Sequence, residues 1–251
     1  MLAVMMTEQG ERKRADVERL GEQMRQDWNA RAALDPWHYV LFRPSGKWRE
    51  DGEAELGQLQ NSLDFEIKPS DRVLEIGCGV GRLTWTLARR AQEVWALDIS
   101  SEMLEMAKEN LPDFSNVHFL LGDGTTLADI PSGSKDLVFS ALTLTHLPHR
   151  SLVLGYLAEA ARVLAPGGRL AVQVNNESKA RFLARMAVHQ TLSMLMIRRG
   201  RRRLERGRTW SGSRIDLAAV REGLEAGGMR LLRVSGTASL ACWIHAVREQ
   251  G

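Results

Sequence analysis

The chain has few cysteines: two, Cys78 and Cys242, in 251 residues. A pair so far apart in the sequence provides neither a disulfide framework nor the four ligands of a structural zinc site. Scarce cysteine is typical of a protein that works in a reducing compartment. We therefore expect a cytoplasmic protein whose fold depends on its core.

Long apolar runs are also lacking. No stretch approaches the roughly 18 apolar residues that a membrane-spanning helix needs. The apolar segment Met1–Met6 is shorter than the core of a signal peptide, and charged residues follow it directly. The sequence therefore predicts no membrane span.

Positive charge is small and local. The formal net charge is +3, yet residues 198–208 alone hold seven arginines and one glutamate. The rest of the chain is therefore slightly acidic, whereas a general nucleic-acid binder spreads basic residues over one face. Nucleic acid is not expected as a partner.

Short apolar runs alternate with helical patterns through most of the chain. Their apolar character is continuous, which predicts strands buried on both faces of a parallel sheet with helices on each side. The predicted strands are 72–76, 93–97, 117–121, 136–140, 169–174, 230–234 and 242–247, and the predicted helices are 82–90, 101–111, 150–164, 178–197 and 216–226.

Two segments stand outside this alternation. The sequence of residues 1–70 predicts a helical cap, of which about the first ten residues are expected to be frayed. The last helix of this cap has an apolar stripe at Ala54, Leu56 and Leu59. Residues 71–251 form the main domain, which carries a helical and basic insertion at 176–213. The Met-rich helix of the insertion is compatible with a substrate lid. It is equally compatible with a helix that packs on the domain or on a second copy of the chain, so a homodimer remains one of the alternatives. The arginine run fits a solvated loop, an acidic substrate, lipid headgroups or RNA.

The strongest chemical signal is the run Val73-Leu74-Glu75-Ile76-Gly77-Cys78-Gly79-Val80-Gly81. Glycines directly after a buried strand let the backbone turn sharply and approach a ligand, and the helix that follows presents its N-terminal amides. Asp98 ends the next strand, where a carboxylate can accept hydrogen bonds from ribose hydroxyls. A helix-capping role is the plainer alternative for Asp98.

A nicotinamide-binding enzyme would use a related turn. Its fingerprint, G-x-G-x-x-G/A, requires a small third residue that here is Arg82. A large side chain would crowd a pyrophosphate at this point. The turn therefore favours a nucleoside ligand without phosphate.

Residues 72–170 resemble class I S-adenosylmethionine (SAM)-dependent methyltransferases, especially the small-molecule enzymes of the ubiquinone-biosynthesis type. The motifs that carry the resemblance are Val73–Gly81, Asp98-Ile99-Ser100, Gly122-Asp123-Gly124, Asp136–Ser140 and Leu164–Leu170. The resemblance implies a Rossmann-like α/β fold with a seven-stranded, mostly parallel sheet of order 3-2-1-4-5-7-6 and an antiparallel last strand. It also implies SAM as cofactor and S-adenosylhomocysteine as its product.

The resemblance assigns roles along the carboxyl edge of the sheet. Gly77 and Gly79 would pass under the methionine part of SAM, Glu75 would support that loop, and Asp98 would hold the ribose. The full set of implied cofactor residues is Glu75, Gly77, Cys78, Gly79, Gly81, Asp98, Ile99, Met103, Asp123, Gly124 and Ser140. Ile99 and Met103 would pack on the adenine, while Asp123 and Gly124 would meet its polar edge. Asp123 is alternatively a turn-forming residue, and Met103 a core residue.

Residues for the methyl acceptor follow the fourth strand. His146 is the candidate general base, because histidine titrates near neutrality; a structural role in shaping the SAM pocket is its alternative. His149 is expected to be exposed. Tyr39 and Trp210 are candidate substrate contacts. Metal-dependent catechol enzymes place a carboxylate where this chain has Ser140, so no metal is expected.

The sequence thus predicts methyl transfer to O, N or C of a small molecule, with a natural product among the candidates. A non-catalytic SAM-binding protein and an RNA-modifying methyltransferase that uses the basic insertion remain the alternatives.

Overall fold

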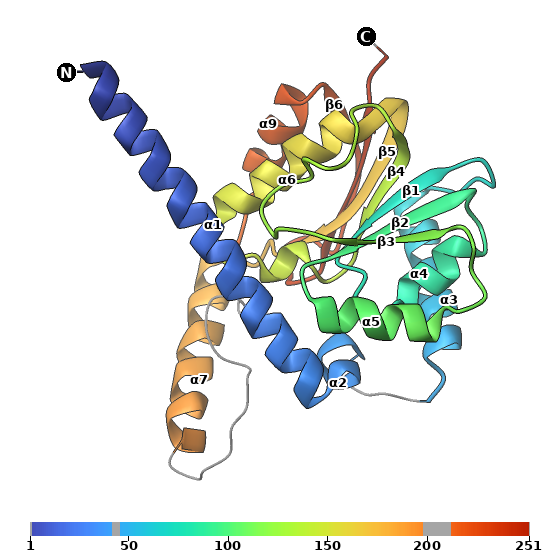
Figure 1. The fold of residues 1–251 in the computed structure, drawn as a ribbon, viewed down its shortest axis with the longest axis horizontal. Helices are drawn as coiled ribbons and strands as arrows, with labels where there is room; N and C mark the ends of the chain where they lie inside the picture. The colour runs from blue at the N-terminus through green and yellow to red at the C-terminus, as the bar shows by residue number, and fades with distance from the viewer. Residues whose placement is uncertain (1, 42–45, 198–211, 251) are drawn as a thin grey trace.

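The computed structural model describes residues 2–41, 46–197 and 212–250. The arginine run at 198–208 and the candidate substrate contact Trp210 lie outside the described residues. A single seven-stranded sheet organises the fold, in the order β3-β2-β1-β4-β5-β7-β6 (Figure 1). The strands are β1 (Arg72–Ile76), β2 (Glu93–Asp98), β3 (Val117–Leu121), β4 (Lys135–Ser140), β5 (Leu164–Val174), β6 (Met229–Ser235) and β7 (Cys242–Arg248).

The first five strands of this sheet run parallel, and β7 pairs antiparallel with both β5 and β6. The predicted strands and their order are therefore confirmed. β5 begins at Leu164, five residues before its predicted start, because Leu164 pairs with Lys135 ahead of a register shift in β4.

Helices cover both faces of the sheet (Figure 1). α3 (Trp48–Leu63), α4 (Arg82–Ala88) and α5 (Ser101–Asn110) lie on one face, and α6 (Arg150–Val163) and α9 (Leu217–Ala226) on the other. Neighbouring residues of β1 show why the strand is apolar throughout: Val73 packs with α3 and α4, whereas Leu74 packs with α6. Alternate side chains point to opposite faces, so a central strand needs apolar residues at every position.

The edge strands differ from that prediction. β3 has no fully buried residue, and the side chain of its Leu121 is 48% exposed. β6 is likewise mostly half-buried or exposed. Each edge strand has a neighbouring strand on one side only, so its residues are less completely buried than those of the central strands.

The apolar stripe of α3 also differs in part from its prediction. Leu56 and Leu59 are buried as expected, together with Gly52 and Leu63, but Ala54 is exposed. The buried set keeps the spacing of three to four residues expected of one helical face.

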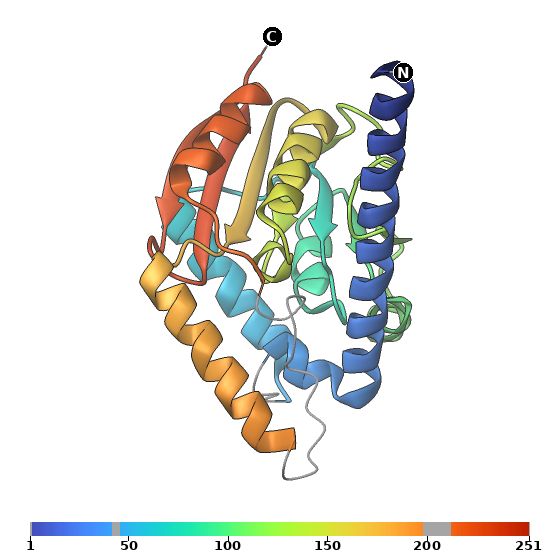
Figure 2. The ribbon, with the colours of Figure 1, turned by 90° about the vertical axis from the view of Figure 1, so that its left-hand side faces the viewer.

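Two N-terminal helices form the cap. α1 (Leu2–Leu34) runs along the outside of the fold and α2 (Pro36–Leu41) turns back beneath it (Figures 1 and 2). The helix starts at Leu2, and the fraying of the first ten residues stays a prediction. The α1 residues Arg25 and Asn29 donate to Gly122 O and Ser101 Oγ at 3.2 and 3.4 Å. The cap is thus docked on the loops after β2 and β3.

α7 (Lys179–Ile197) confirms the predicted helix of the insertion and projects from the body beyond the carboxyl end of β5 (Figure 2). Its base is fixed by an ion pair of 2.9 Å between Arg185 and Glu177 and by a hydrogen bond of 3.3 Å from Arg181 to Ala238 O. The choice between a lid and a packing helix stays a prediction, because the chain that follows lies outside the described residues.

Two helical glycines provide a matched test of how α1 docks on the loop after β3. A Cβ on Gly21 of α1 would lie 2.5 Å from the backbone oxygen of Asp123, whereas a Cβ on Gly57 of α3 would meet nothing within 4 Å. Gly57→Ala should raise the free energy of unfolding by up to about 1 kcal/mol through helix propensity. Gly21→Ala should lower it, because α1 must shift away from the loop. Urea unfolding of both variants measures these changes, and equal increases in the free energy of unfolding would contradict the close contact between α1 and the loop.

Candidate functional site

The turn between β1 and α4 depends on glycine. Gly77 has φ +77°, and a Cβ there would lie 1.9 Å from Thr143 Oγ1. Its N–H and that of Cys78 both donate to Leu97 O, at 2.7 and 3.0 Å. The turn is therefore anchored to the end of β2 and pressed against the loop after β4, where no larger side chain fits.

Asp98, the last residue of β2, is tied to the same turn. Its Oδ2 accepts from Gly79 N at 2.8 Å and its Oδ1 from Ser100 N at 2.9 Å. Burial raises the pKa of Asp98, and these backbone donors oppose the rise. Ser100 is the N-cap of α5, because its hydroxyl accepts from Met103 N at 3.1 Å. Ser100, and not Asp98, is thus the N-cap residue of α5, and Asp98 ties the start of that helix to the glycine turn.

Glu75 links β1 to α4 from beneath the turn. The carboxylate accepts from Thr84 Oγ1 at 2.6 Å. The side chain is almost fully buried, and this burial raises the pKa of Glu75 to about 7. Glu75 therefore changes charge near neutral pH.

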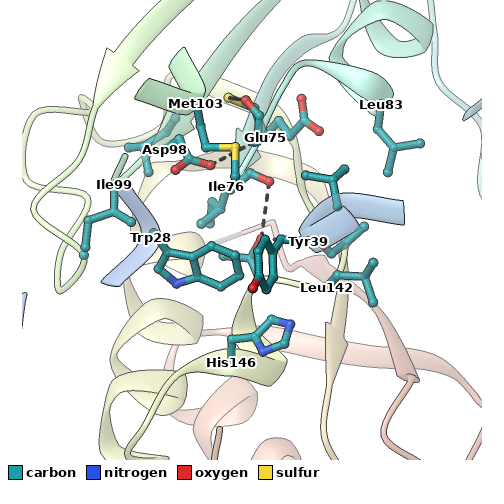
Figure 3. A pocket seen from close by; sticks show the side chains of 18 of the residues that line it. Trp28, Tyr39, Glu75, Ile76, Leu83, Asp98, Ile99, Met103, Leu142 and His146 are labelled. Carbon is teal, nitrogen blue, oxygen red and sulfur yellow. Dashed lines mark hydrogen bonds between the residues drawn. The ribbon is translucent and has the colours of Figure 1, made fainter. Parts of the chain in front are cut away.

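A cavity opens above these residues at the carboxyl edge of the sheet (Figure 3). Its volume is about 1020 Å³ with the open mouth and the adjoining solvent included. Most of the predicted cofactor residues line it: Glu75, Gly77, Cys78, Gly79, Asp98, Ile99, Met103 and Gly124. Tyr39 and His146, the candidate acceptor residues, line the same cavity.

Three predicted cofactor residues lie outside this lining. Ser140 is fully buried and donates through Oγ to Ile76 O at 2.9 Å. Gly81 is where α4 meets α5, since a Cβ would lie 2.4 Å from Leu111 Cδ1. The carboxylate of Asp123 accepts from the backbone N–H groups of Thr125 and Thr126 at 2.6 and 2.7 Å. Asp123 therefore stabilises the turn after β3, and a contact of Asp123, Ser140 or Gly81 with the cofactor stays a prediction.

The cap contributes lining residues that sequence reasoning missed. Met24 and Trp28 of α1 and Val40 of α2 reach the cavity. The indole of Trp28 meets the imidazole of His146 edge-on, with ring centroids 5.4 Å apart and an interplanar angle of 73°. The guanidinium of Arg31, almost fully buried, lies 4.9 Å from the Trp28 ring. The aromatic stretch from Trp28 to Tyr39 was the available signal, but its position in space was not.

Leu142 has unusual geometry in the loop after β4. It lines the cavity with φ +58°, a left-handed conformation that costs a non-glycine residue about 1–3 kcal/mol. Its N–H donates to the Oε1 of Gln173, a buried residue of β5, at 2.9 Å. The loop is thus held in a strained conformation at the cavity wall. His149, a few residues on, is exposed as predicted.

Within the part of the chain that the structure describes, no helix is long and apolar enough to cross a membrane. Among the same residues, no group of three or more His, Cys, Asp or Glu side chains gathers in a way that could hold a metal ion.

Comparison with known proteins supports one family. Residues 74–172 match the family model described as "Methyltransferase domain". The chain is 34% identical over 142 residues to a demethylmenaquinone methyltransferase of Tropheryma whipplei, covering 56% of this chain and 53% of the relative. It is 30% identical over 128 residues to a ubiquinone biosynthesis O-methyltransferase of Xanthomonas oryzae pv. oryzae, covering 51% and 52%.

Residues 74–172 of this chain are thus similar to a methyltransferase domain. The matched segment runs from β1 to β5 and so contains the glycine turn, Asp98 and His146. The chain spans about half the length of the curated relatives that it matches.

Solved structures share the fold of the methyltransferase domain. A SAM-dependent methyltransferase from Aquifex aeolicus aligns with a TM-score of 0.55 at 22% identity, covering 86% of this chain and 99% of that one. A putative methyltransferase in complex with the Haloferax volcanii Trm112 activator aligns with a TM-score of 0.62 at 17% identity, covering 89% and 98%. The fold therefore extends well beyond the segment that sequence comparison matches.

The raised pKa of Glu75 predicts a pH-dependent stability of the methyltransferase domain. Between its unfolded pKa near 4.5 and its folded pKa of about 7, the folded protein holds a proton that the unfolded chain has released. This contribution to the free energy of unfolding is largest below about pH 4.5 and is lost as the pH rises to about 7. Glu75→Gln stays neutral, so its free energy of unfolding should rise relative to that of the wild type by up to about 3 kcal/mol between pH 4.5 and pH 8.

Chemical denaturation at a series of pH values measures this difference. Glu105→Gln is the control, because Glu105 is 69% exposed in a surface pair with Lys108 and should track the wild type. Parallel pH profiles for Glu75→Gln and the wild type would show that Glu75 has no raised pKa.

Proposed function

We propose that this chain is a SAM-dependent methyltransferase that acts on a small molecule. The observation that carries the proposal is the buried carboxylate of Asp98, which lines the cavity and is hydrogen-bonded to the glycine turn. A carboxylate has more lone pairs than the two bonds to backbone N–H groups use. It can therefore accept ribose hydroxyls from the cavity side.

We assign the remaining parts of SAM to the same cavity. Adenine would lie against Ile99, Met103 and Gly124, which line the cavity, and Met24 approaches Gly124 from the cap. Gly77 and Gly79 offer backbone close to the methionine part, with Glu75 beneath them. Two buried acids beside the turn suit a ligand whose sulfur and amino group are positive. When bound, the cofactor supplies an electrophilic methyl group on that sulfur.

The nicotinamide alternative meets an obstacle in Arg82. This first residue of α4 is buried and lines the cavity, with Nη1 2.7 Å from Glu55 Oε2. A dinucleotide pyrophosphate would need that space and the amides at the helix start. Arg82 stands at the sequence position of the third glycine of the dinucleotide fingerprint, and its ion pair with Glu55 holds it against α3.

The acceptor would lie beside His146. Methyl transfer needs the acceptor atom about 3–3.5 Å from the methyl carbon and in line with the breaking bond. His146 comes from the short η1 helix (Leu144–His146) after β4 and lines the cavity next to Trp28. We propose that its imidazole takes the acceptor's proton. Its other role, shaping the cavity through Trp28, is compatible with this one.

The first prediction concerns the cofactor. Asp98→Asn should weaken the binding of S-adenosylhomocysteine by about tenfold or more, corresponding to more than about 1 kcal/mol, because one ribose acceptor is lost. Isothermal titration calorimetry measures the dissociation constant. Asp129→Asn, an exposed acid remote from the cavity lining, should leave it unchanged. Absence of binding to the wild-type protein would refute the proposed function.

The second prediction concerns His146. With any acceptor that the protein methylates, His146→Gln should lower kcat by about 10²–10⁴-fold if the imidazole is the base. The dissociation constant of S-adenosylhomocysteine should stay within about threefold. Release of S-adenosylhomocysteine, followed against pH, measures the effect. A variant that keeps kcat and its pH profile would leave His146 with the shaping role alone.

A further inference from the structure

We propose that the acceptor end of the cavity selects an uncharged, flat ring and discriminates against carboxylates and other anions. This inference rests on the proposed function, because it concerns the space beside the cofactor seat. The acceptor end is the part of the cavity bounded by Trp28, Tyr39, Leu142 and His146 (Figure 3).

Charge is the first argument. The charged residues that line the cavity, among those the structure describes, are Glu75, Arg82 and Asp98. The arginine is 4% exposed and forms an ion pair with Glu55, and its place at the start of α4 is beside the glycine turn. Arg31 is close by, 4.9 Å from the Trp28 ring, but it is not among the residues that line the cavity. An anionic acceptor would thus give up its hydration for a space lined by two acids and by one arginine that is already paired with Glu55. Such a transfer is unfavourable unless the charge is paired.

Shape is the second argument. Three rings from three separate elements surround the acceptor end: Trp28 of α1, Tyr39 of α2 and His146 of η1. The first and last meet edge-on at 5.4 Å, and Tyr39 is buried. Aromatic walls bind a flat ring by offset stacking or by edge-to-face contact. A puckered aliphatic ring of equal size would gain less from them.

Leu142 is the third argument. It is 37% exposed yet lines the cavity, and its left-handed backbone is held by Gln173 through a hydrogen bond of 2.9 Å. Strained backbone persists where the surrounding structure enforces it, and such residues cluster at ligand sites. Here the result is an apolar side chain, the isobutyl group of Leu142, at the wall. Leu142 is therefore the residue we assign as setting the polarity of the acceptor end.

Three probes of similar size test the proposal: 2-naphthol, 6-hydroxy-2-naphthoate and 2-decalol. Each is titrated into the protein saturated with S-adenosylhomocysteine, at pH 8.5, where an ordinary imidazole is neutral. We expect 2-naphthol to bind at least about tenfold more tightly than the naphthoate, and more tightly than the non-planar decalol. Equal or tighter binding of the naphthoate, or no binding of 2-naphthol, would overturn the proposal.

A charge-introducing variant makes the test specific to the wall. Leu142→Lys keeps a flexible side chain at the same backbone position and adds a cation to the acceptor end. It should strengthen naphthoate binding by about tenfold and weaken 2-naphthol binding. Leu232→Lys is the matched control, because Leu232 is 44% exposed on the edge strand β6, and it should change neither. An unchanged preference in Leu142→Lys would show that Leu142 does not set the polarity.

The cofactor titration separates the two levels of inference. If the protein does not bind S-adenosylhomocysteine, the proposed function fails. If it binds S-adenosylhomocysteine but prefers the anionic probe, the proposed function stands and the acceptor class assigned here is wrong.

Discussion

The hydrogen bond from Gly79 N to the Asp98 carboxylate connects the two strand ends on which the site depends. β1 and β2 are parallel neighbours in register, with Ile76 opposite Leu97. Their carboxyl ends therefore finish side by side. The turn after β1 uses this proximity by donating two further backbone hydrogen bonds to Leu97 O. A buried carboxylate would be costly alone, but here it is both the anchor of the turn and the acceptor that faces the cavity.

A second constraint joins the glycine turn to the loop after β4, on the other side of the cavity. Thr143, in the loop after β4, donates to Gly77 O at 3.3 Å and occupies the space that a Cβ on Gly77 would need. The loop that carries Leu142 and His146 is thus pressed directly on the glycine turn. A larger residue at position 77 would move both halves of the site at once. The glycine therefore matters as much for the acceptor side as for the cofactor.

How far the sequence predicts the molecule differs between these halves. The strands and the positions of Glu75, Gly77, Gly79 and Asp98 were predictable, because a buried parallel strand followed by a glycine turn leaves a local pattern. The order of the strands came instead from the resemblance to methyltransferases. Asp123 lies in the loop after β3 as expected, but its carboxylate accepts hydrogen bonds within its own turn, and the adjacent sequence does not show that it lies outside the cavity lining. The β5 start at Leu164 was missed because a register shift is a property of the pair of strands.

The acceptor side was harder to predict because it is assembled from segments that share no local pattern. Trp28 belongs to a long helix with a weakly apolar sequence, and it reaches His146 only because α1 docks on the loops after β2 and β3. That docking depends on the missing side chain of Gly21, which in the sequence reads only as a helix-weakening residue. The strand ends and the glycine turn can therefore be inferred from adjacent residues, whereas the wall beside His146 depends on how distant segments of the chain pack together.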